Sequence, residues 1–369
     1  MTDHSLGALA GITVLDFSTL LPGPMASLML AACGARIIKV ERAPAGDEMR
    51  SYQPSADGVA IEFAMLNRGK ESLALDLKKP EARAAILELI PDVDVVLEQF
   101  RPGVMERLGL GADTLLRRNP ALIYCAIRGY GPGPNRDRAG HDLSYMADAG
   151  LLELSEPSGG RPVVPPVLIA DIAGGTLPAV MNISLALLQR ERTGRGSILE
   201  LAIADNLRMF GHRGLSHYYA GQELPHRGKD LLNGGTPRYH IYKTKDGRAL
   251  AVAALENRFW KTFCEAANVP MSASISDVAT AIELHDFAHW SEVFDKVDCC
   301  VRPVLDFREA LASMGTTTEA RKHPPSLPLP LAETLQRSSE LPSAPGLGRD
   351  NPAFRHVTMR TSGSAEDVG

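Results

Sequence analysis

The fold is decided by residues 12–41, which contain ITVLDF at 12–17, PGPMASLMLAACG at 22–34 and ARIIKVE at 35–41. The first and last of these stretches are short apolar runs rich in β-branched residues, which is typical of buried strands. Between them, prolines open a segment of helix-forming residues and Gly34 closes it. A strand, a helix and a second strand in this order predict two parallel strands joined by a right-handed crossover.

The same alternation continues along the first half of the chain. Further strands are predicted at 72–77, 93–100, 122–129 and 197–203, and helices at 82–90, 112–118, 143–154 and 171–192. Near-continuous apolar strands separated by helices are typical of a parallel sheet that is covered on both faces. We therefore predict an α/β fold with a doubly wound, Rossmann-like sheet.

A different pattern begins near residue 235. The runs RYHIYKT and RALAVAAL flank Asp246 and Gly247, which is typical of a hairpin with a tight turn, and a helix is expected from Glu256 onward. The stretch 324–346 is rich in proline and is expected to be extended. The predicted organisation is a large α/β domain at 1–205, a linker at 206–234, a smaller α+β domain at 235–312 and a proline-rich segment at 313–369.

The composition excludes several classes of protein. A net charge of −5 does not favour a nucleic-acid-binding surface, and 44% hydrophobic residues exclude general disorder. Five cysteines without a C-x-x-C pair indicate a reducing compartment. The N-terminus lacks the pattern of a secretory signal, and the uncharged run at 172–188 is better explained as a buried helix than as a membrane span. We expect a soluble cytoplasmic protein with no nucleic-acid or membrane partner.

Several catalytic motifs are missing. The first strand-to-helix turn, FSTLLPGPMAS, lacks the G-x-G-x-x-G pattern of dinucleotide-binding sheets, and no P-loop or G-x-S-x-G motif occurs. His285 and His289 have helical spacing but no third ligand, so no metal site is expected. These absences disfavour a dinucleotide-dependent oxidoreductase, a serine hydrolase and a metalloenzyme.

Two short stretches are better candidates for chemistry. The first is AGHDLSY at 139–145, in which His141 directly precedes a predicted helix, where the helix dipole favours a neutral imidazole that can act as a base. The second is VLIADIAGG at 167–175, in which Asp171 ends an apolar run and begins a helix. Asp171 could equally be a simple helix cap, and His141 a hydrogen-bonded loop residue.

Seven motifs occur in a recognisable order. They are LDFS and LPGP within 15–24, GARIIKVER at 34–42, NRGKESLALDLK at 67–78, RPGVMERLGL at 101–110, AGHDLSY at 139–145, LIADIAGG at 168–175 and AALE at 253–256. In this order and spacing the chain resembles the family III CoA-transferases over residues 9–310, and within them the α-methylacyl-CoA racemase branch.

The resemblance implies an acyl-CoA thioester as ligand and no metal or organic cofactor apart from the CoA of the substrate. It implies that CoA and the acyl group are bound by Arg42, Asn67, Arg68, Gly69, Lys70, Arg101, Gly140, Asp142 and Tyr145. It also implies that the segment 313–369 returns to the large domain and that two subunits form an interlocked homodimer. Glu256 matches a glutamate that racemases place near the active site.

Two reactions are compatible with this resemblance. In a racemase, His141 and Asp171 would remove and return the α-proton of a 2-methylacyl-CoA, and backbone N–H groups near Asp171 would stabilise the enolate. In a CoA-transferase, Asp171 would be a nucleophile that forms an aspartyl-CoA thioester. His141 favours the racemase, because transferases generally lack this histidine. Val167 departs from the racemase pattern, which has asparagine there. A CoA-thioester-binding protein without turnover is a third possibility.

Overall fold

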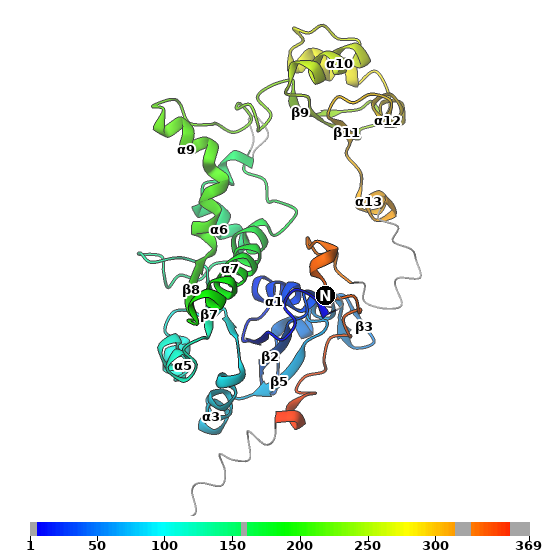
Figure 1. Ribbon diagram of the computed structural model, residues 1–369. Helices are drawn as coiled ribbons and strands as arrows, with labels where there is room; N and C mark the ends of the chain where they lie inside the picture. The colour runs from blue at the N-terminus through cyan, green and yellow to red at the C-terminus, as the bar shows by residue number, and fades with distance from the viewer. Residues whose placement is uncertain (1–5, 156–160, 314–325, 355–369) are drawn as a thin grey trace, which may run out of the picture. The chain divides into compact units, whose positions relative to one another are not determined.

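The computed structural model describes residues 6–155, 161–313 and 326–354, and the chain divides into two compact units. The large unit is built from the segments 1–146, 167–209 and 322–369, and the small unit from 147–166 and 210–321 (Figure 1). Most of the segment predicted as a linker, 206–234, therefore groups with the small unit.

The large unit contains a six-stranded parallel sheet. Its strands are β1 (Thr13–Asp16), β2 (Arg36–Arg42), β5 (Glu71–Leu75), β6 (Val95–Glu98), β7 (Ile123–Arg128) and β8 (Ser197–Ala202). Their order is β5-β2-β1-β6-β7-β8, and Leu15 in the centre pairs with Ile38 on one side and Val96 on the other. All six predicted strands are confirmed. From β1 the chain adds β2 and β5 on one side of the sheet, and then β6, β7 and β8 on the other, so β1 and β6 flank a topological switch point. Parallel sheets bind ligands at such a point, at the carboxyl ends of the strands.

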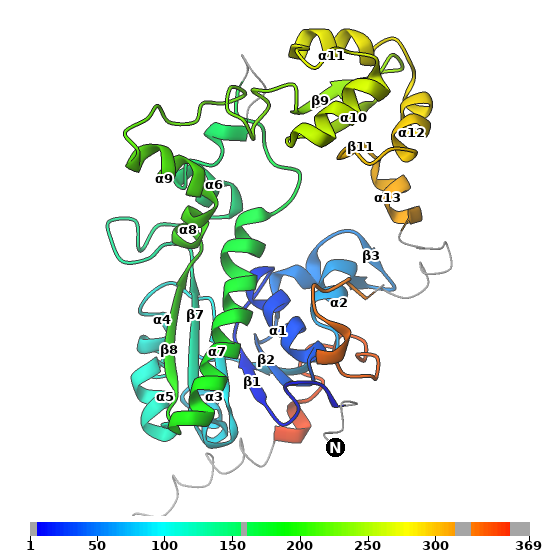
Figure 2. The same ribbon diagram turned by 45° about the horizontal axis from the view of Figure 1, so that its top comes forward.

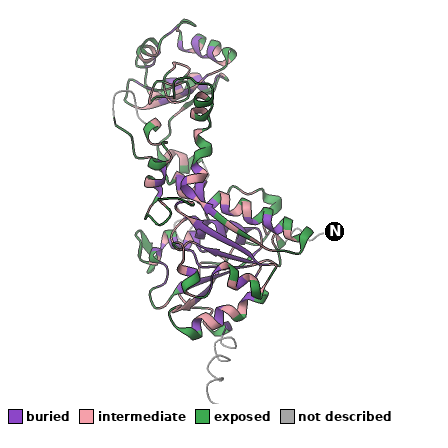
Figure 3. Cartoon of the chain, turned by 90° about the vertical axis from the view of Figure 1, so that its left-hand side faces the viewer, coloured by how far each residue is buried: buried purple, intermediate pink, exposed green. Residues whose placement is uncertain are grey.

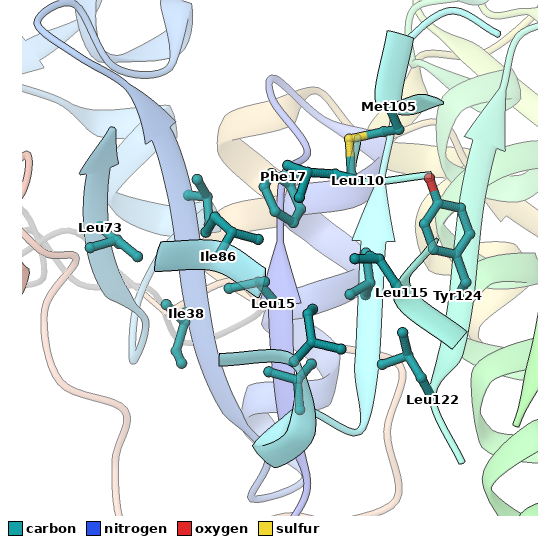
Figure 4. Packing of buried hydrophobic residues seen from close by; sticks show 14 of the residues in the cluster. Leu15, Phe17, Ile38, Leu73, Ile86, Met105, Leu110, Leu115, Leu122 and Tyr124 are labelled. Carbon is teal, nitrogen blue, oxygen red and sulfur yellow. The ribbon is translucent and has the colours of Figure 1, made fainter. Parts of the chain in front are cut away.

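Helices cover both faces of this sheet (Figure 2). One face packs on α3 (Pro80–Leu89), α4 (Val104–Arg107) and α5 (Ala112–Arg118), and Figure 4 shows Leu15 and Ile38 of the strands with Ile86, Met105 and Leu115 of these helices. The other face packs on α1 (Pro22–Ala32) and α7 (Leu177–Thr193). The central strands β1, β6 and β7 are almost wholly buried, because helices cover both of their faces, whereas the edge strand β8 is partly exposed (Figure 3). The sheet is doubly wound, as predicted.

Two helices differ from the prediction. The helix expected at 143–154 is the shorter α6 (Asp142–Asp148), followed by a turn at Gly150, whose positive φ of 73° is left-handed. The helix expected at 171–192 begins as a π-helix, η5 (Ala170–Thr176), before α7 continues and ends at Gly194 in the predicted left-handed cap. Among the described residues, the continuous helical stretch 170–193 is the one segment long and apolar enough to cross a membrane, and here it packs on α1, β7 and β8.

The small unit has an antiparallel sheet with the order β11-β10-β9. Its elements are β9 (Tyr239–Lys243), β10 (Ala249–Ala253), α10 (Asn257–Ala267), α11 (Ile275–Ile282), α12 (Phe287–Asp295), β11 (Val301–Pro303) and α13 (Phe307–Ser313). The predicted hairpin is confirmed, with Gly247 at a φ of 83°. The three-residue β11 was not predicted, because it is too short to show a period.

The segment 326–354 packs along the large unit, which agrees with a return to the large domain. Leu327, Leu329 and Leu331 pack against the apolar cluster around Met25 and Phe63. Asp350 and Asn351 accept hydrogen bonds from the backbone N–H groups of β5 at Ser72 and Ala74, both 2.8 Å long. These contacts cover the free edge of β5, which would otherwise expose unpaired backbone groups.

The remaining short elements connect these layers. They are η2 (Glu48–Ser51), β3 (Ser55–Ala56), β4 (Val59–Ala60), α2 (Ile61–Leu66), η3 (Ile90–Asp92), η4 (Glu153–Ser155), α8 (Ile203–Asn206), η6 (Leu207–Gly211), α9 (His212–Tyr219), η8 (Glu333–Leu335) and η9 (Asn351–Phe354).

Candidate active site

A cavity of about 250 Å³ lies at the switch point of the sheet. Its walls come from the loops that follow β1, β6 and β7 and from the start of η5, and it contains both His141 and Asp171. We call it the Asp171 cavity. Residues far apart in the sequence meet there because the carboxyl ends of parallel strands share one edge of the sheet.

Asp171 is half-buried in the first turn of η5, so it is not the N-cap, which is Ile169. Its backbone N–H donates to Oδ2 of Asp142, at 2.9 Å. Burial raises the pKa of the Asp171 carboxyl to about 6, and the charge of Asp142 adds to this effect while His141 opposes it. Asp171 is therefore a carboxylate that can both lose and hold a proton near neutral pH.

Two glycines allow η5 to approach its neighbours closely. A Cβ atom on Gly174 would lie 2.8 Å from the carbonyl oxygen of Ile203, and one on Gly175 would lie 3.0 Å from Cβ of Pro22. Thr176 Oγ1 also donates to the carbonyl oxygen of Pro22, at 2.9 Å. The start of η5 is thereby fixed against the turn between β1 and α1, and this contact sets the place of Asp171.

His141 is exposed and directly precedes α6. Its backbone N–H donates to Ser144 Oγ, at 2.8 Å, and Ser144 Oγ donates to the His141 carbonyl oxygen, at 2.7 Å. Within the described ranges its imidazole makes no hydrogen bond, while it lines the cavity together with Asp171. The ring is therefore held at the cavity by its backbone and is open to a ligand.

Gly140, Asp142 and Tyr145, the other residues predicted in the stretch 139–145, make different contacts from those of His141. Tyr145 and Gly140 line the cavity, and the Tyr145 hydroxyl donates to the Gly140 carbonyl oxygen, at 2.7 Å. Burial raises the pKa of Tyr145 to about 12, with a further contribution from Asp171. Asp142 is buried, does not line the cavity and accepts a hydrogen bond from the backbone N–H of Asp171, and its predicted part in substrate binding stays a prediction. That hydrogen bond occupies the Asp171 N–H, so the predicted stabilisation of the enolate by backbone N–H groups near Asp171 stays a prediction for the neighbouring groups.

The lining of the Asp171 cavity is strongly cationic. Arg101, predicted from the sequence, lines it together with Arg136 and Arg138, and none of the three forms an ion pair with a described carboxylate. Arg128 also lines it but is paired with the buried Glu98, at 2.7 Å. Sequence reasoning missed Arg128, Arg136 and Arg138, although an arginine-containing run directly after a strand was a usable signal.

A second cavity, of about 380 Å³, opens beside the first at the ends of β1, β2 and β5. Its charged lining residues are the cations Arg42 and Lys78 and the carboxylates Glu41, Asp47, Glu48 and Asp76, and apolar side chains supply much of the rest. Phe100 lines both cavities. Arg42, predicted to bind a CoA phosphate, is exposed there, and we call this second space the Arg42 cavity.

The NRGK motif at 67–70 lies elsewhere. Asn67 and Lys70 are fully buried, and Lys70 Nζ donates to Asn67 Oδ1 and to the Pro24 carbonyl oxygen, both at 2.9 Å. Neither side chain lines a described cavity, and the prediction that Asn67 and Lys70 line the nucleotide end of CoA stays a prediction. Arg68 pairs with Glu340 at 2.7 Å, and Gly69 has a φ of 73° and faces Leu341, so these two residues contact the return segment.

Glu256 belongs to the small unit, where it is the residue before α10 and its carbonyl oxygen accepts from Trp260 N–H, at 2.9 Å. Its predicted part in the active site stays a prediction. In the part of the chain that the structure describes, no group of three or more His, Cys, Asp or Glu residues is arranged to hold a metal ion.

Comparison with known proteins gives a consistent picture. The model of the CoA-transferase family III matches residues 9–351. The human alpha-methylacyl-CoA racemase is 36% identical over 82% of this chain and 79% of its own length. The succinyl-CoA:mesaconate CoA-transferase of Haloarcula hispanica is 35% identical over 79% of this chain and 76% of its own. The crystal structure of Rv3272 from Mycobacterium tuberculosis superposes with a TM-score of 0.81, at 26% identity, and covers 95% of this chain and 99% of that one. The chain belongs to CoA-transferase family III.

Proposed function

We propose that this protein is a racemase that interconverts the (2R) and (2S) forms of 2-methylacyl-CoA thioesters. One observation carries the proposal: His141 and Asp171, two groups able to exchange a proton, line one cavity at the switch point of the sheet. Racemisation needs two such groups, because a proton leaves one face of the α-carbon and another returns to the opposite face. The 36% identity to a human racemase supports the proposal.

In the proposed reaction, one member of the pair takes the α-proton and the thioester becomes an enolate. The other member then donates a proton from the opposite face, and the two exchange roles in the reverse direction. A pKa of about 6 leaves Asp171 mostly ionised at neutral pH and still able to hold a proton during turnover. The negative charge on the enolate oxygen would be stabilised by Arg101, Arg136 or Arg138, since these side chains have no carboxylate partner among the described residues.

We propose that CoA spans the two cavities. The nucleotide would occupy the Arg42 cavity, whose apolar walls suit adenine and whose Arg42 and Lys78 suit phosphate. The pantetheine arm would pass Phe100, and the thioester would lie in the Asp171 cavity. Binding energy from the remote nucleotide would then hold the small reacting group in place. The reaction as proposed calls on no metal or organic cofactor.

The exposed face of α7 supports the proposed homodimer. Leu177, Met181, Leu185 and Leu188 are spaced by three or four residues along this helix, and each is more than 40% exposed. A continuous apolar stripe of this kind is unusual on the surface of a monomer and is typical of a protein–protein interface. We propose that a second copy of the chain covers it and that Glu256 acts near the active site of the assembled dimer.

The alternative function is CoA transfer between carboxylic acids. The Asp171 carboxylate would attack the thioester carbonyl, release CoA as a thiolate and form a mixed anhydride. The thiolate would then attack the aspartyl carbonyl, giving an aspartyl-CoA thioester and releasing the donor carboxylate. An acceptor carboxylate would displace the thiolate to form a second anhydride, and the thiolate would attack its acceptor carbonyl, giving the new acyl-CoA and free Asp171. The 35% identity to a mesaconate CoA-transferase favours this reading. Asp171 would then be a nucleophile, and His141 would have no proton to transfer.

Isotope exchange separates the two reactions. The protein is incubated in D2O with one enantiomer of a 2-methylacyl-CoA and no acceptor acid, and deuterium at the α-carbon and optical purity are followed by NMR. A racemase incorporates deuterium while optical purity falls, and His141→Ala and Asp171→Asn each lower the rate by about 100-fold or more. Matched controls are His289→Ala and Asp113→Asn, an exposed histidine and a carboxylate in the first turn of α5. No exchange, together with CoA transfer to an added carboxylic acid, would establish the alternative.

A further inference from the structure

Four charged side chains with almost no exposure lie next to the two cavities, and one of them, Asp47, is in the wall of the Arg42 cavity. They are Asp16 at the end of β1, Lys39 in β2, Asp47 before η2, and Lys70 before β5. Each is 1% exposed or less. We call these two acids and two bases the buried cluster; burial lowers the pKa of Lys70 to about 7, although the charge of Asp16 opposes this effect. Charges so far from water are rare unless they are paired, so their contacts call for an explanation.

The contacts converge on one turn. Lys39 Nζ pairs with Asp47 Oδ2 at 2.9 Å and donates to the Ser18 carbonyl oxygen at 2.7 Å. Asp47 accepts from the backbone N–H of Leu20, with both oxygens 3.3 Å away. Asp16 Oδ1 accepts from the Ser18 N–H at 2.8 Å. Three members of the buried cluster thus bind backbone groups of residues 18–20, which follow β1.

Lys70 anchors the other end of this turn. It donates to the carbonyl oxygen of Pro24, in the first turn of α1, and lies 3.6 Å from Asp16 Oδ2. Burial would raise the pKa of Asp16, but Lys70 and Lys39 outweigh it and keep the pKa below its usual value. Asp16 is therefore a charged carboxylate, and it links the two lysines electrostatically.

The turn held in this way forms the boundary of both cavities. Thr19 lines the Arg42 cavity, and Leu20 lines the Asp171 cavity. Leu20 has a φ of 61°, a left-handed conformation that a leucine rarely adopts. Such a conformation persists only where surrounding contacts impose it, and here the hydrogen bond from Leu20 to Asp47 is one of those contacts.

We propose that Lys39 and Asp47 are positioning residues, which hold the turn at residues 18–20 so that the thioester in the Asp171 cavity is aligned with the acid and base. The inference rests on the proposal that this cavity is the active site, whichever of the two reactions it catalyses. It also assigns a role to the NRGK motif: Lys70 supports the ligand site from inside the protein.

The test is a neutral double variant, Lys39→Met/Asp47→Asn. It removes both buried charges together, which avoids a single unpaired charge and often costs little stability. The matched control is Arg190→Met/Asp94→Asn. Arg190 and Asp94 also form an ion pair, at 2.8 Å, and Asp94 Oδ2 accepts from Thr13 N–H at the start of β1, at 2.8 Å. The control thus removes an ion pair at the amino end of β1, whereas Asp16 of the buried cluster lies at the carboxyl end of this strand.

Three readouts are needed: kcat and KM for the CoA thioester, the affinity for CoA by calorimetry, and hydrogen–deuterium exchange of the peptide that contains Leu20. The Lys39/Asp47 variant should lose about 10- to 100-fold in kcat, change KM far less, and exchange faster at this peptide. The control variant should keep its kcat within about twofold. Turnover of the wild-type protein is measured first. If the wild type converts the thioester, a normal kcat in the variant contradicts this inference alone, and if the wild type is inactive, the proposed reaction is wrong.

An unchanged kcat in the Lys39/Asp47 variant, with normal exchange at Leu20, would overturn the inference. If that variant does not fold, Lys39→Gln/Asp47→Asn is tested, because it also removes both charges while the two amides keep a donor for the Ser18 carbonyl oxygen and an acceptor for the Leu20 N–H. The expected loss of kcat is then about three- to tenfold. A kcat and an exchange rate equal to those of the wild type would overturn the inference as well.

Discussion

The two units of the chain bury different kinds of side chain. The core of the small unit is apolar and aromatic, with Phe263 stacked between Trp260 and Phe294 at centroid distances of 5.1 and 5.7 Å. Among the described residues, Thr244 is the only polar side chain buried there, whereas the large unit buries Asp16, Lys39 and Glu98 among others. Burial of apolar side chains stabilises a fold, whereas burial of a charged side chain has a cost in desolvation free energy. The contrast indicates where function has shaped the sequence.

The largest expected effect tests the apolar half of this comparison. Phe263→Ala should destabilise the small unit by about 3–5 kcal/mol, because a large cavity would remain between two aromatic rings. Phe263 is fully buried. The measurement is urea unfolding followed by tryptophan fluorescence, since Trp260 and Trp290 both lie in this core. Phe307→Ala is the control, because Phe307 is 80% exposed and its loss should have little effect. A similar loss from both variants would contradict the assignment of this core.

The architecture could be predicted well from the sequence because it depends on local patterns. The strand β6 is wholly buried and has the sequence VVLE, and α1 has two prolines in its first turn, so a local pattern predicts each element. Helix lengths were less accurate. The helix expected at 171–192 begins as the π-helix η5, in which Gly174 packs closely against Ile203, a residue from after β8. No local pattern encodes such a contact.

The site was only partly predictable for the same reason. His141, Asp171 and Arg101 meet in one cavity, as expected from loops at the ends of parallel strands. The sequence could not distinguish an exposed lysine from a buried one, and so it did not show that Lys70 is enclosed in the protein. Nor could it show that Asp142 holds the backbone of Asp171. Lys70 and Asp142 are both polar residues whose contact partners are known only once the chain has folded.

A smaller effect on stability is expected from Asp171, a half-buried carboxylate of the large unit. The pKa of Asp171 is about 6 in the folded protein and 3.8 in its ordinary state. The folded state therefore binds this proton more tightly than the unfolded chain, and stability falls as the pH rises from about 4 to about 6. Asp171→Asn removes this loss and should stabilise the protein by about 1–3 kcal/mol at pH 7.5 and by nearly nothing at pH 4. Thermal unfolding at the two pH values measures the difference, with Asp113→Asn as the control.

An equal shift at both pH values would mean that the stabilisation does not come from the ionisation of Asp171. A destabilised Asp171→Asn variant at pH 7.5 would mean that the carboxylate has a favourable partner in the folded state. Either result would contradict the view that this carboxylate is kept at the cavity for its reactivity rather than for stability.

The smallest expected effect compares how the two units end a helix. In the large unit α7 ends at Gly194, with a φ of 68°, and in the small unit α10 ends at Asn268, with a φ of 52°. Both positions are left-handed, and a Cβ atom on Gly194 would meet nothing within 4 Å, so only the backbone conformation matters there. Gly194→Ala should therefore cost about 1 kcal/mol, and Asn268→Gly should gain at most a few tenths. Urea unfolding of the two variants measures both. Because this rule depends on backbone geometry alone, it should hold in both units, whatever they bury. A loss from Asn268→Gly larger than that from Gly194→Ala would show that the Asn268 side chain itself stabilises the small unit.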